Sequence, residues 1–103
     1  MISHKDFTFT IGYEGNIAVV DGTLKKRYGS LSTEQLAEKQ LYKQAICSAV
    51  YEESSGKARG EVLQRVLEIY NRNAAEKIGS VEALKRTFGV HEVPEGIAKV
   101  TVI

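Results

Sequence analysis

The sequence predicts an α+β domain, in which a small, mainly antiparallel sheet packs against two long helices and one short helix. Three observations predict this fold class. The chain up to residue 28 contains two-residue alternation and tight-turn signals, its middle changes to a period of three to four residues, and residues 97–103 are enriched in β-branched side chains. Because strands precede and follow the helices, we expect the C-terminal strand to join an N-terminal hairpin or meander.

The N-terminal part alternates apolar and polar residues over 7–13, which predicts a half-buried strand with Phe7, Phe9, Ile11 and Tyr13 on one face. Residues 14–16 contain a glycine and read as a tight turn. A second strand is expected over 17–20. These two strands would form the hairpin.

A second tight turn is expected at Asp21-Gly22, because both residues of this pair tolerate the positive φ angles of a hairpin turn. The segment 23–28 has two interpretations. A third strand is favoured, and a single helical turn is the alternative, since three consecutive basic residues have little strand propensity.

Residues 32–53 carry apolar side chains at spacings of three and four, which indicates one amphipathic helix of about five turns. Ser32 and the glutamine three positions later match a capping box at its start. A second helix is expected from about 58 to 78. A short third helix over 81–88 would be closed by Gly89.

The length of 103 residues fits one domain spanning 1–103. Fourteen Lys and Arg against thirteen Asp and Glu give a net charge of +1, so no overall field favours nucleic acid or an anionic membrane. Cys47 is the only cysteine, which fits a reducing compartment. No pattern typical of a secretory signal or membrane span is present, so we expect a cytoplasmic protein without membrane contact.

Two stretches resemble parts of a helix-turn-helix DNA-binding module. Residues 31–39 are similar to its opening helix and residues 42–46 to the start of its recognition helix. Only residues 40–41 separate them, and neither is glycine or a turn former, so one continuous helix explains the segment better. A second partial resemblance over 83–90 fails because Pro94 would lie inside the recognition helix. DNA reading by either stretch is therefore not expected.

Few residues suggest chemistry. His4, His91 and Cys47 lie far apart in the sequence, so no metal or cofactor is expected. His4 belongs to a terminus that we expect to fray. The Gly56-Lys57 pair lacks the remaining residues of a phosphate-binding loop, and Glu52-Glu53 would point apart on a helix rather than share a proton. No catalytic residue is assigned, and a non-enzymatic protein is favoured.

The favoured function is therefore a protein-interaction or homo-oligomerisation module, with a dimer as the simplest assembly. This hypothesis depends on the terminal strand 97–103, whose apolar side chains need to be covered by their own sheet or by a second subunit. The expected oligomer interface consists of Val100, Val102 and Ile103.

Two alternatives remain open. The first is a nucleic-acid-binding protein that contacts phosphates through the basic cluster at 25–27 and nearby lysines, with Phe7, Phe9 and Tyr13 available for base stacking. The second is a small-molecule-binding protein or enzyme with a pocket between sheet and helices. The candidate phosphate-binding residues are Lys25, Lys26, Arg27, Lys39 and Lys43.

Overall fold

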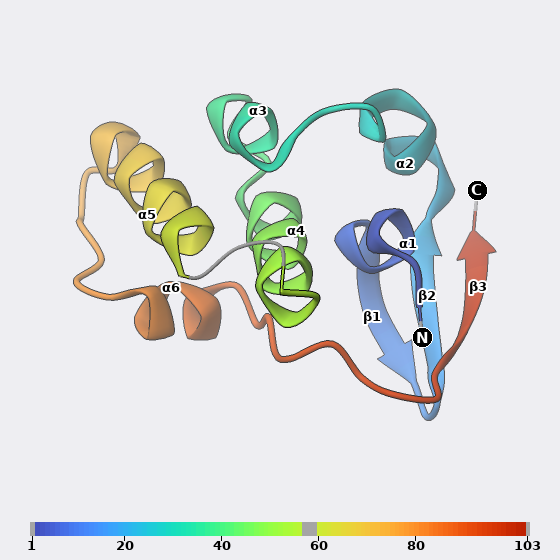
Figure 1. Cartoon of the computed structure of the whole chain (residues 1–103). Coiled ribbons are helices and arrows are strands. Elements are labelled where there is room, and N and C mark those ends of the chain that lie inside the picture. The colour runs from blue at the N-terminus through green and yellow to red at the C-terminus, as the bar shows by residue number, and fades with distance from the viewer. Residues whose placement is uncertain (1, 57–59, 103) are drawn as a thin grey trace.

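The computed structural model describes residues 2–56 and 60–102 and confirms the α+β class (Figure 1). One sheet contains the strands in the order β1 (Thr10–Glu14), β2 (Ile17–Asp21) and β3 (Ala98–Val102). β1 and β2 are antiparallel, whereas β2 and β3 are parallel, so the sheet is mixed. The C-terminal strand therefore pairs with the N-terminal hairpin, as expected.

The helices gather on one side of this sheet. In Figure 1, α1 lies between α4 and the strands, α3, α5 and α6 lie farther out, and α2 sits at the end of β2. Within the described residues, the helices are α1 (His4–Thr8), α2 (Gly22–Tyr28), α3 (Thr33–Glu38), α4 (Tyr42–Ser54), α5 (Glu61–Asn73) and α6 (Val81–Thr87).

The strand expected over 7–13 is wrong in its first half, because β1 begins only at Thr10. The preceding residues form α1, whose first turn is capped by the hydroxyl of Ser3. Phe7 and Phe9 are nevertheless buried, with 2% and 1% exposure. Ile11 and Tyr13, expected on the same face, are instead 47% and 48% exposed, and Thr8 and Thr10 of the opposite face are buried. The alternation therefore predicted the burial of the two phenylalanines but neither the backbone nor the rest of the pattern.

The expected turn at Asp21-Gly22 is also wrong. The Asp21 carboxylate accepts a hydrogen bond of 3.0 Å from the backbone N–H of Leu24, so it caps a helix instead of joining two strands. Residues 23–28 continue α2, which corrects the favoured strand in favour of the helical alternative. Aspartate is favoured both in tight turns and at the N-cap position of a helix. The Asp-Gly pair alone therefore could not distinguish a hairpin turn from a helix start.

The single helix expected over 32–53 is divided in two. The capping box at Ser32 is present, but α3 ends at Glu38 and α4 begins at Tyr42. Gln40 adopts a φ of 65°, the left-handed conformation that usually requires glycine at a helix end. The absence of glycine therefore did not prevent the turn.

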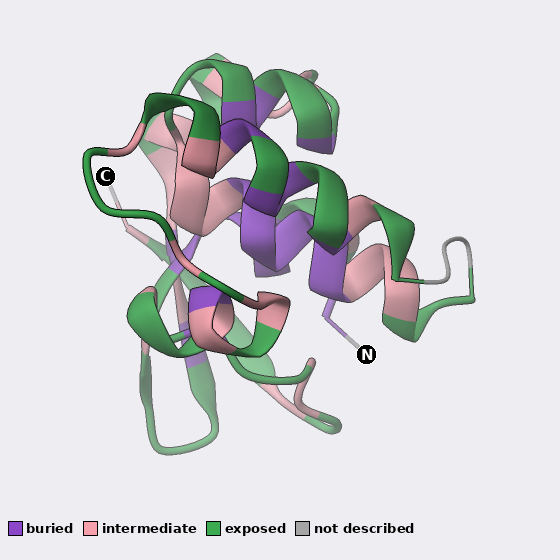
Figure 2. Ribbon diagram, turned by 90° about the vertical axis from the view of Figure 1, so that its left-hand side faces the viewer, coloured by how far each residue is buried: buried purple, intermediate pink, exposed green. Residues whose placement is uncertain are grey.

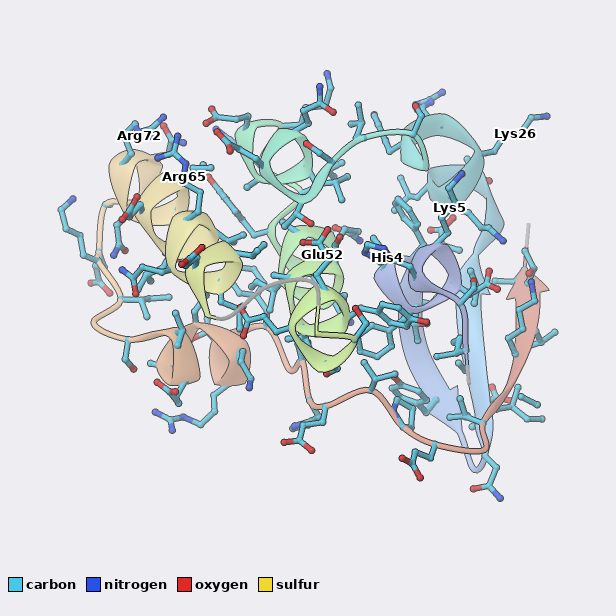
Figure 3. The ribbon with its side chains drawn as sticks, in the orientation of Figure 1. His4, Lys5, Lys26, Glu52, Arg65 and Arg72 are labelled. Atoms are coloured by element: carbon cyan, nitrogen blue, oxygen red, sulfur yellow. The ribbon has the colours of Figure 1, made fainter. Side chains whose placement is uncertain are left out.

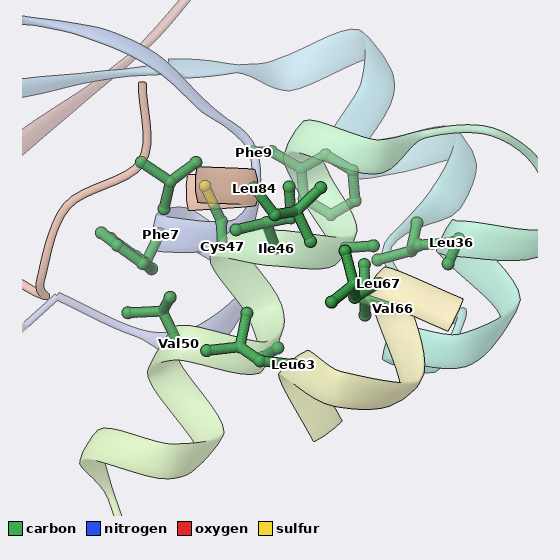
Figure 4. Packing of buried hydrophobic residues seen from close by; sticks show 14 of the residues in the cluster. Phe7, Phe9, Leu36, Ile46, Cys47, Val50, Leu63, Val66, Leu67 and Leu84 are labelled. Atoms are coloured by element: carbon green, nitrogen blue, oxygen red, sulfur yellow. The ribbon is translucent and has the colours of Figure 1, made fainter. Parts of the chain in front are cut away.

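α4 is the central helix of the molecule. All residues from 45 to 50 are buried, and the helix packs against α1, α3 and α5 (Figure 2). Figure 4 shows Ile46 of α4 among Leu63 and Val66 of α5 and neighbouring core residues. A helix buried around its circumference cannot enter a DNA groove, so the turn between α3 and α4 does not create a DNA-reading module.

The remaining helices follow the sequence more closely. α5 is shorter than the helix expected over 58–78, and residues 57–59 lie outside those described. α6 is capped by Ser80, and Gly89 takes a φ of 66° just after its end, as predicted. On the solvent side, Arg65 and Arg72 of α5 donate to two glutamates of α3 at 3.1 and 3.5 Å (Figure 3).

The strained turn gives a direct test of the α3–α4 division. Replacing Gln40 by Gly should raise the free energy of unfolding by about 0.5–1 kcal/mol, because glycine adopts a φ near 65° without the Cβ penalty. Urea denaturation measures the change. Gln44→Gly is the matched control: it lies inside α4 and should lower stability by about 1 kcal/mol. A loss of stability in both variants would contradict the division.

Candidate functional site

The sheet has one covered face and one open face. On β2, Ala18 and Val20 are fully buried against the helices, while Ile17 and Val19 point the other way. Aligned residues of neighbouring strands share a face, and the register pairs Val19 with Val100. The apolar residues of β2 and β3 on the open side therefore form one continuous surface.

We call this the outer sheet face, and its apolar residues are Ile17, Val19, Ala98, Val100 and Val102. Ile17 and Val100 are 41% and 44% exposed, and Val102 is half-buried. β3 is an edge strand, and in Figure 1 no labelled element lies beyond it. Two of the three expected interface residues thus lie on an open edge of the sheet, while Ile103 lies outside the described residues.

The other face of β3 is polar. Lys99 aligns with the buried Ala18 and Thr101 with the buried Val20, so both point toward the helical side. Lys99 uses this position to reach α1, where its Nζ lies 3.0 Å from an oxygen of Asp6. β3 is therefore apolar outside and anchored by charge inside.

Asp6 is the acidic partner of Lys99 in this ion pair. Its carboxylate is buried and accepts hydrogen bonds from Lys25 Nζ at 2.6 Å and from the Ser3 hydroxyl at 2.9 Å, while Lys99 Nζ lies against the second oxygen. Burial raises the pKa of Asp6, but the hydrogen bonds from Lys25, Lys99 and Ser3 outweigh it, so the pKa is lowered from 3.8 to about 2. One carboxylate thereby joins α1, α2 and β3.

The five basic residues proposed for phosphate binding have different environments. Lys25 is held by Asp6, and Lys43 donates to the backbone carbonyl of Ile11 at 3.5 Å. The exposed members of the set are Lys26, Arg27 and Lys39. Lys26 and Arg27 lie on α2 and Lys39 lies in the turn after α3, so the set is distributed over separate elements.

The prediction that Phe7, Phe9 and Tyr13 are available for base stacking is wrong for the two phenylalanines. Phe7 and Phe9 are core residues with almost no exposed surface, so they cannot stack on bases. Figure 4 shows both rings inside the packed cluster. Tyr13 alone of the three is open, at 48% exposure.

A chain of polar side chains at the junction of α1, α3 and α4 was missed by the sequence analysis. His4 Nε2 lies 2.8 Å from Ser48 Oγ, Ser48 Oγ lies 2.6 Å from Thr33 Oγ1, and Thr33 donates to Glu52 at 3.1 Å. A cavity of about 130 Å³ lies beside them. The prediction of a frayed His4 is wrong, because its ring also stacks on Tyr51 with centroids 4.9 Å apart.

The direction of these hydrogen bonds decides what the chain can do. A carboxylate accepts, so Thr33 gives its one proton to Glu52 and Ser48 must give its own to Thr33. His4 then donates through Nε2 to Ser48. A serine nucleophile needs the opposite arrangement, in which histidine accepts the serine proton. The chain in this arrangement therefore ties helices together and does not activate Ser48.

One sequence signal pointed to this chain. Ser48 and Glu52 are four residues apart, a spacing that places two side chains on one face of a helix. His4 and Thr33 come from other helices at separations of 44 and 15 residues from Ser48, and no local pattern connects them.

Protein-family profiles, curated proteins and solved structures provide no match to this chain.

Two further findings concern the described part of the chain. In it, no three His, Cys, Asp or Glu side chains come together as metal ligands could. None of the helices described there combines the length and apolar character needed to cross a bilayer.

The lowered pKa of Asp6 predicts acid sensitivity. The pKa of Asp6 is about 2 in the folded protein and 3.8 in the unfolded chain. Its contribution to the free energy of unfolding is therefore complete above about pH 4 and is lost as pH falls toward 2. The loss amounts to about 2 kcal/mol of unfolding free energy. Urea midpoints across this pH range measure it.

The matched variants are Asp6→Asn and Glu34→Gln. Asp6→Asn should be less stable at pH 7 and should lose this part of the pH dependence. Glu34→Gln removes only an exposed pair with Arg65 and should follow the wild type. Equal acid profiles for wild type and Asp6→Asn would contradict the assignment.

Proposed function

We propose that this protein is a homodimeric interaction module in which the β3 edges of two copies pair antiparallel. The observation that carries the proposal is the open edge of β3 beside the apolar outer sheet face. An edge strand with exposed apolar side chains is a template for another strand, and proteins normally cover it. A second copy of the same edge supplies such a cover without any further partner.

The sequence of β3 suits pairing with itself. Antiparallel pairing centred on Val100 sets this residue opposite its own copy and Ala98 opposite Val102, all on the outer face. On the inner face, Lys99 would stand opposite Thr101, so no two lysines face each other directly. Lys99 is also already paired with Asp6.

The resulting dimer would contain one continuous sheet with β3 strands at its centre. Its outer face would join the apolar residues of both copies into one surface. The two β1 strands would form the far edges of this sheet and would remain free for other contacts. We also infer a cytoplasmic location, which the single, buried thiol of Cys47 supports.

Light scattering during size exclusion over a range of concentrations tests the dimer. Wild type should elute with twice the monomer mass. Val100→Lys should dissociate at least about tenfold more readily, because it would set two ammonium groups opposite each other at the centre of the pairing. Mixing Val100→Lys with Val100→Asp should restore a mixed dimer.

Ile11→Lys is the matched control, because Ile11 is equally exposed at 47% but lies on β1. It should leave the dimer intact. A monomeric wild type at every concentration, or equal dissociation by Val100→Lys and Ile11→Lys, would overturn the proposal.

A further inference from the structure

The opposite edge of the sheet carries a second open surface, which the proposed dimer does not use. A groove of about 340 Å³ runs along β1, between that strand, the first half of α4 and the segment after α6. Ile11 and Tyr13 of β1 line it and are 47% and 48% exposed. Its volume falls within the range of about 300–1,000 Å³ that is typical of binding pockets.

The floor of this groove is mainly apolar. Phe7, Cys47 and Val90 line it and are buried, with 2%, 4% and 4% exposure. Thr10 is the buried polar residue of the lining, and its hydroxyl already donates to the backbone oxygen of Asp6. Burial raises the pKa of the Cys47 thiol to about 11, against a small opposing effect of Lys43, so the thiol is neutral and unreactive at pH 7. The floor thus offers a place for an apolar side chain and none for a charge.

The rim of the groove carries a positive charge from Lys43. His91 also lines it, and no carboxylate does so in the part of the chain that the structure describes. Glu14 and Glu92, although adjacent in sequence to lining residues, are not part of the lining. Among the residues that the structure describes, Lys43 donates one long hydrogen bond of 3.5 Å, to the backbone oxygen of Ile11. Its ammonium group therefore retains donors for an anionic partner.

The backbone beside the groove is equally open. β1 pairs with β2 on one side only, so its other edge offers N–H and C=O groups to an extended chain. A small molecule would use the floor and the lysine but not a strand edge. An extended peptide uses all three, since one side chain enters the groove while its backbone follows the strand.

We propose that the groove between β1 and α4 binds an extended segment of a partner protein, with an apolar side chain on the Cys47 floor and an acidic side chain at Lys43. This goes beyond the proposed dimer, because the groove lies at the edge of the sheet opposite β3. The two proposals can fail separately: Val100→Lys should still bind such peptides even where it is monomeric.

Selection from a library of random short peptides displayed on phage tests the proposal. Wild type should enrich peptides in which a large apolar residue stands near an aspartate or glutamate. Lys43→Glu should reverse the selected charge and weaken the best acidic peptide by about tenfold. Amide shifts in ¹H–¹⁵N spectra should map the bound peptide to Gly12, Tyr13 and the residues around Lys43 and His91.

Lys39→Glu is the matched control, since it makes the same charge change on an exposed lysine outside the groove. It should leave selection and affinity unchanged. Selection without an apolar–acidic pattern, equal weakening by Lys39→Glu and Lys43→Glu, or shifts confined to β3 would each overturn the proposal.

Discussion

One buried carboxylate ties β3 to the helical side of the molecule. Asp6 lies in α1, yet it holds Lys25 of α2 and Lys99 of β3, which are separated from it by 19 and 93 positions. A buried carboxylate without partners would cost several kcal/mol, so Ser3, Lys25 and Lys99 together make the charged form of Asp6 tolerable where it is buried. Together with the backbone pairing of β3 to β2, the contact between Lys99 and Asp6 sets the polar side of β3 toward the helices. The apolar side chains of β3 then lie on the outer sheet face.

That orientation gives the two sides of the molecule different roles. The core of the helical side is closed to solvent, because α4 is enclosed by its neighbours. There the hydrogen-bonded side chains of His4, Ser48, Thr33 and Glu52 satisfy one another's polar groups. On the sheet side, no described element covers the edges of β1 and β3 or the outer sheet face. The proposed interaction module rests on this open side of the sheet.

The sequence predicted the parts of the fold that depend on local patterns. The strands β2 and β3, the capping box at Ser32 and the end of α6 at Gly89 each have a signal within a few residues. The errors arose where two structures share one pattern. Alternating apolar residues over 7–13 suit a strand, but one helical turn followed by a strand buries the same two phenylalanines.

The candidate sites show the same limit. Val100 could be named as a candidate because its strand was recognisable from its own residues. The groove beside β1 could not be predicted from the sequence, because only tertiary packing brings Lys43, Cys47 and His91 near Tyr13. The turn at Gln40 was missed because glycine is preferred there but not required, and contacts of α3 and α4 with α5 outweigh the cost of about 1–2 kcal/mol.

Native-state hydrogen exchange tests the central claim, that Asp6 holds β3 in place. In Asp6→Asn, amides of β3 should exchange more than about tenfold faster than in wild type, while amides in the middle of α5 change much less. Glu34→Gln should leave both regions unchanged. Equal acceleration of β3 and α5, or protection of β3 that survives Asp6→Asn, would contradict the account.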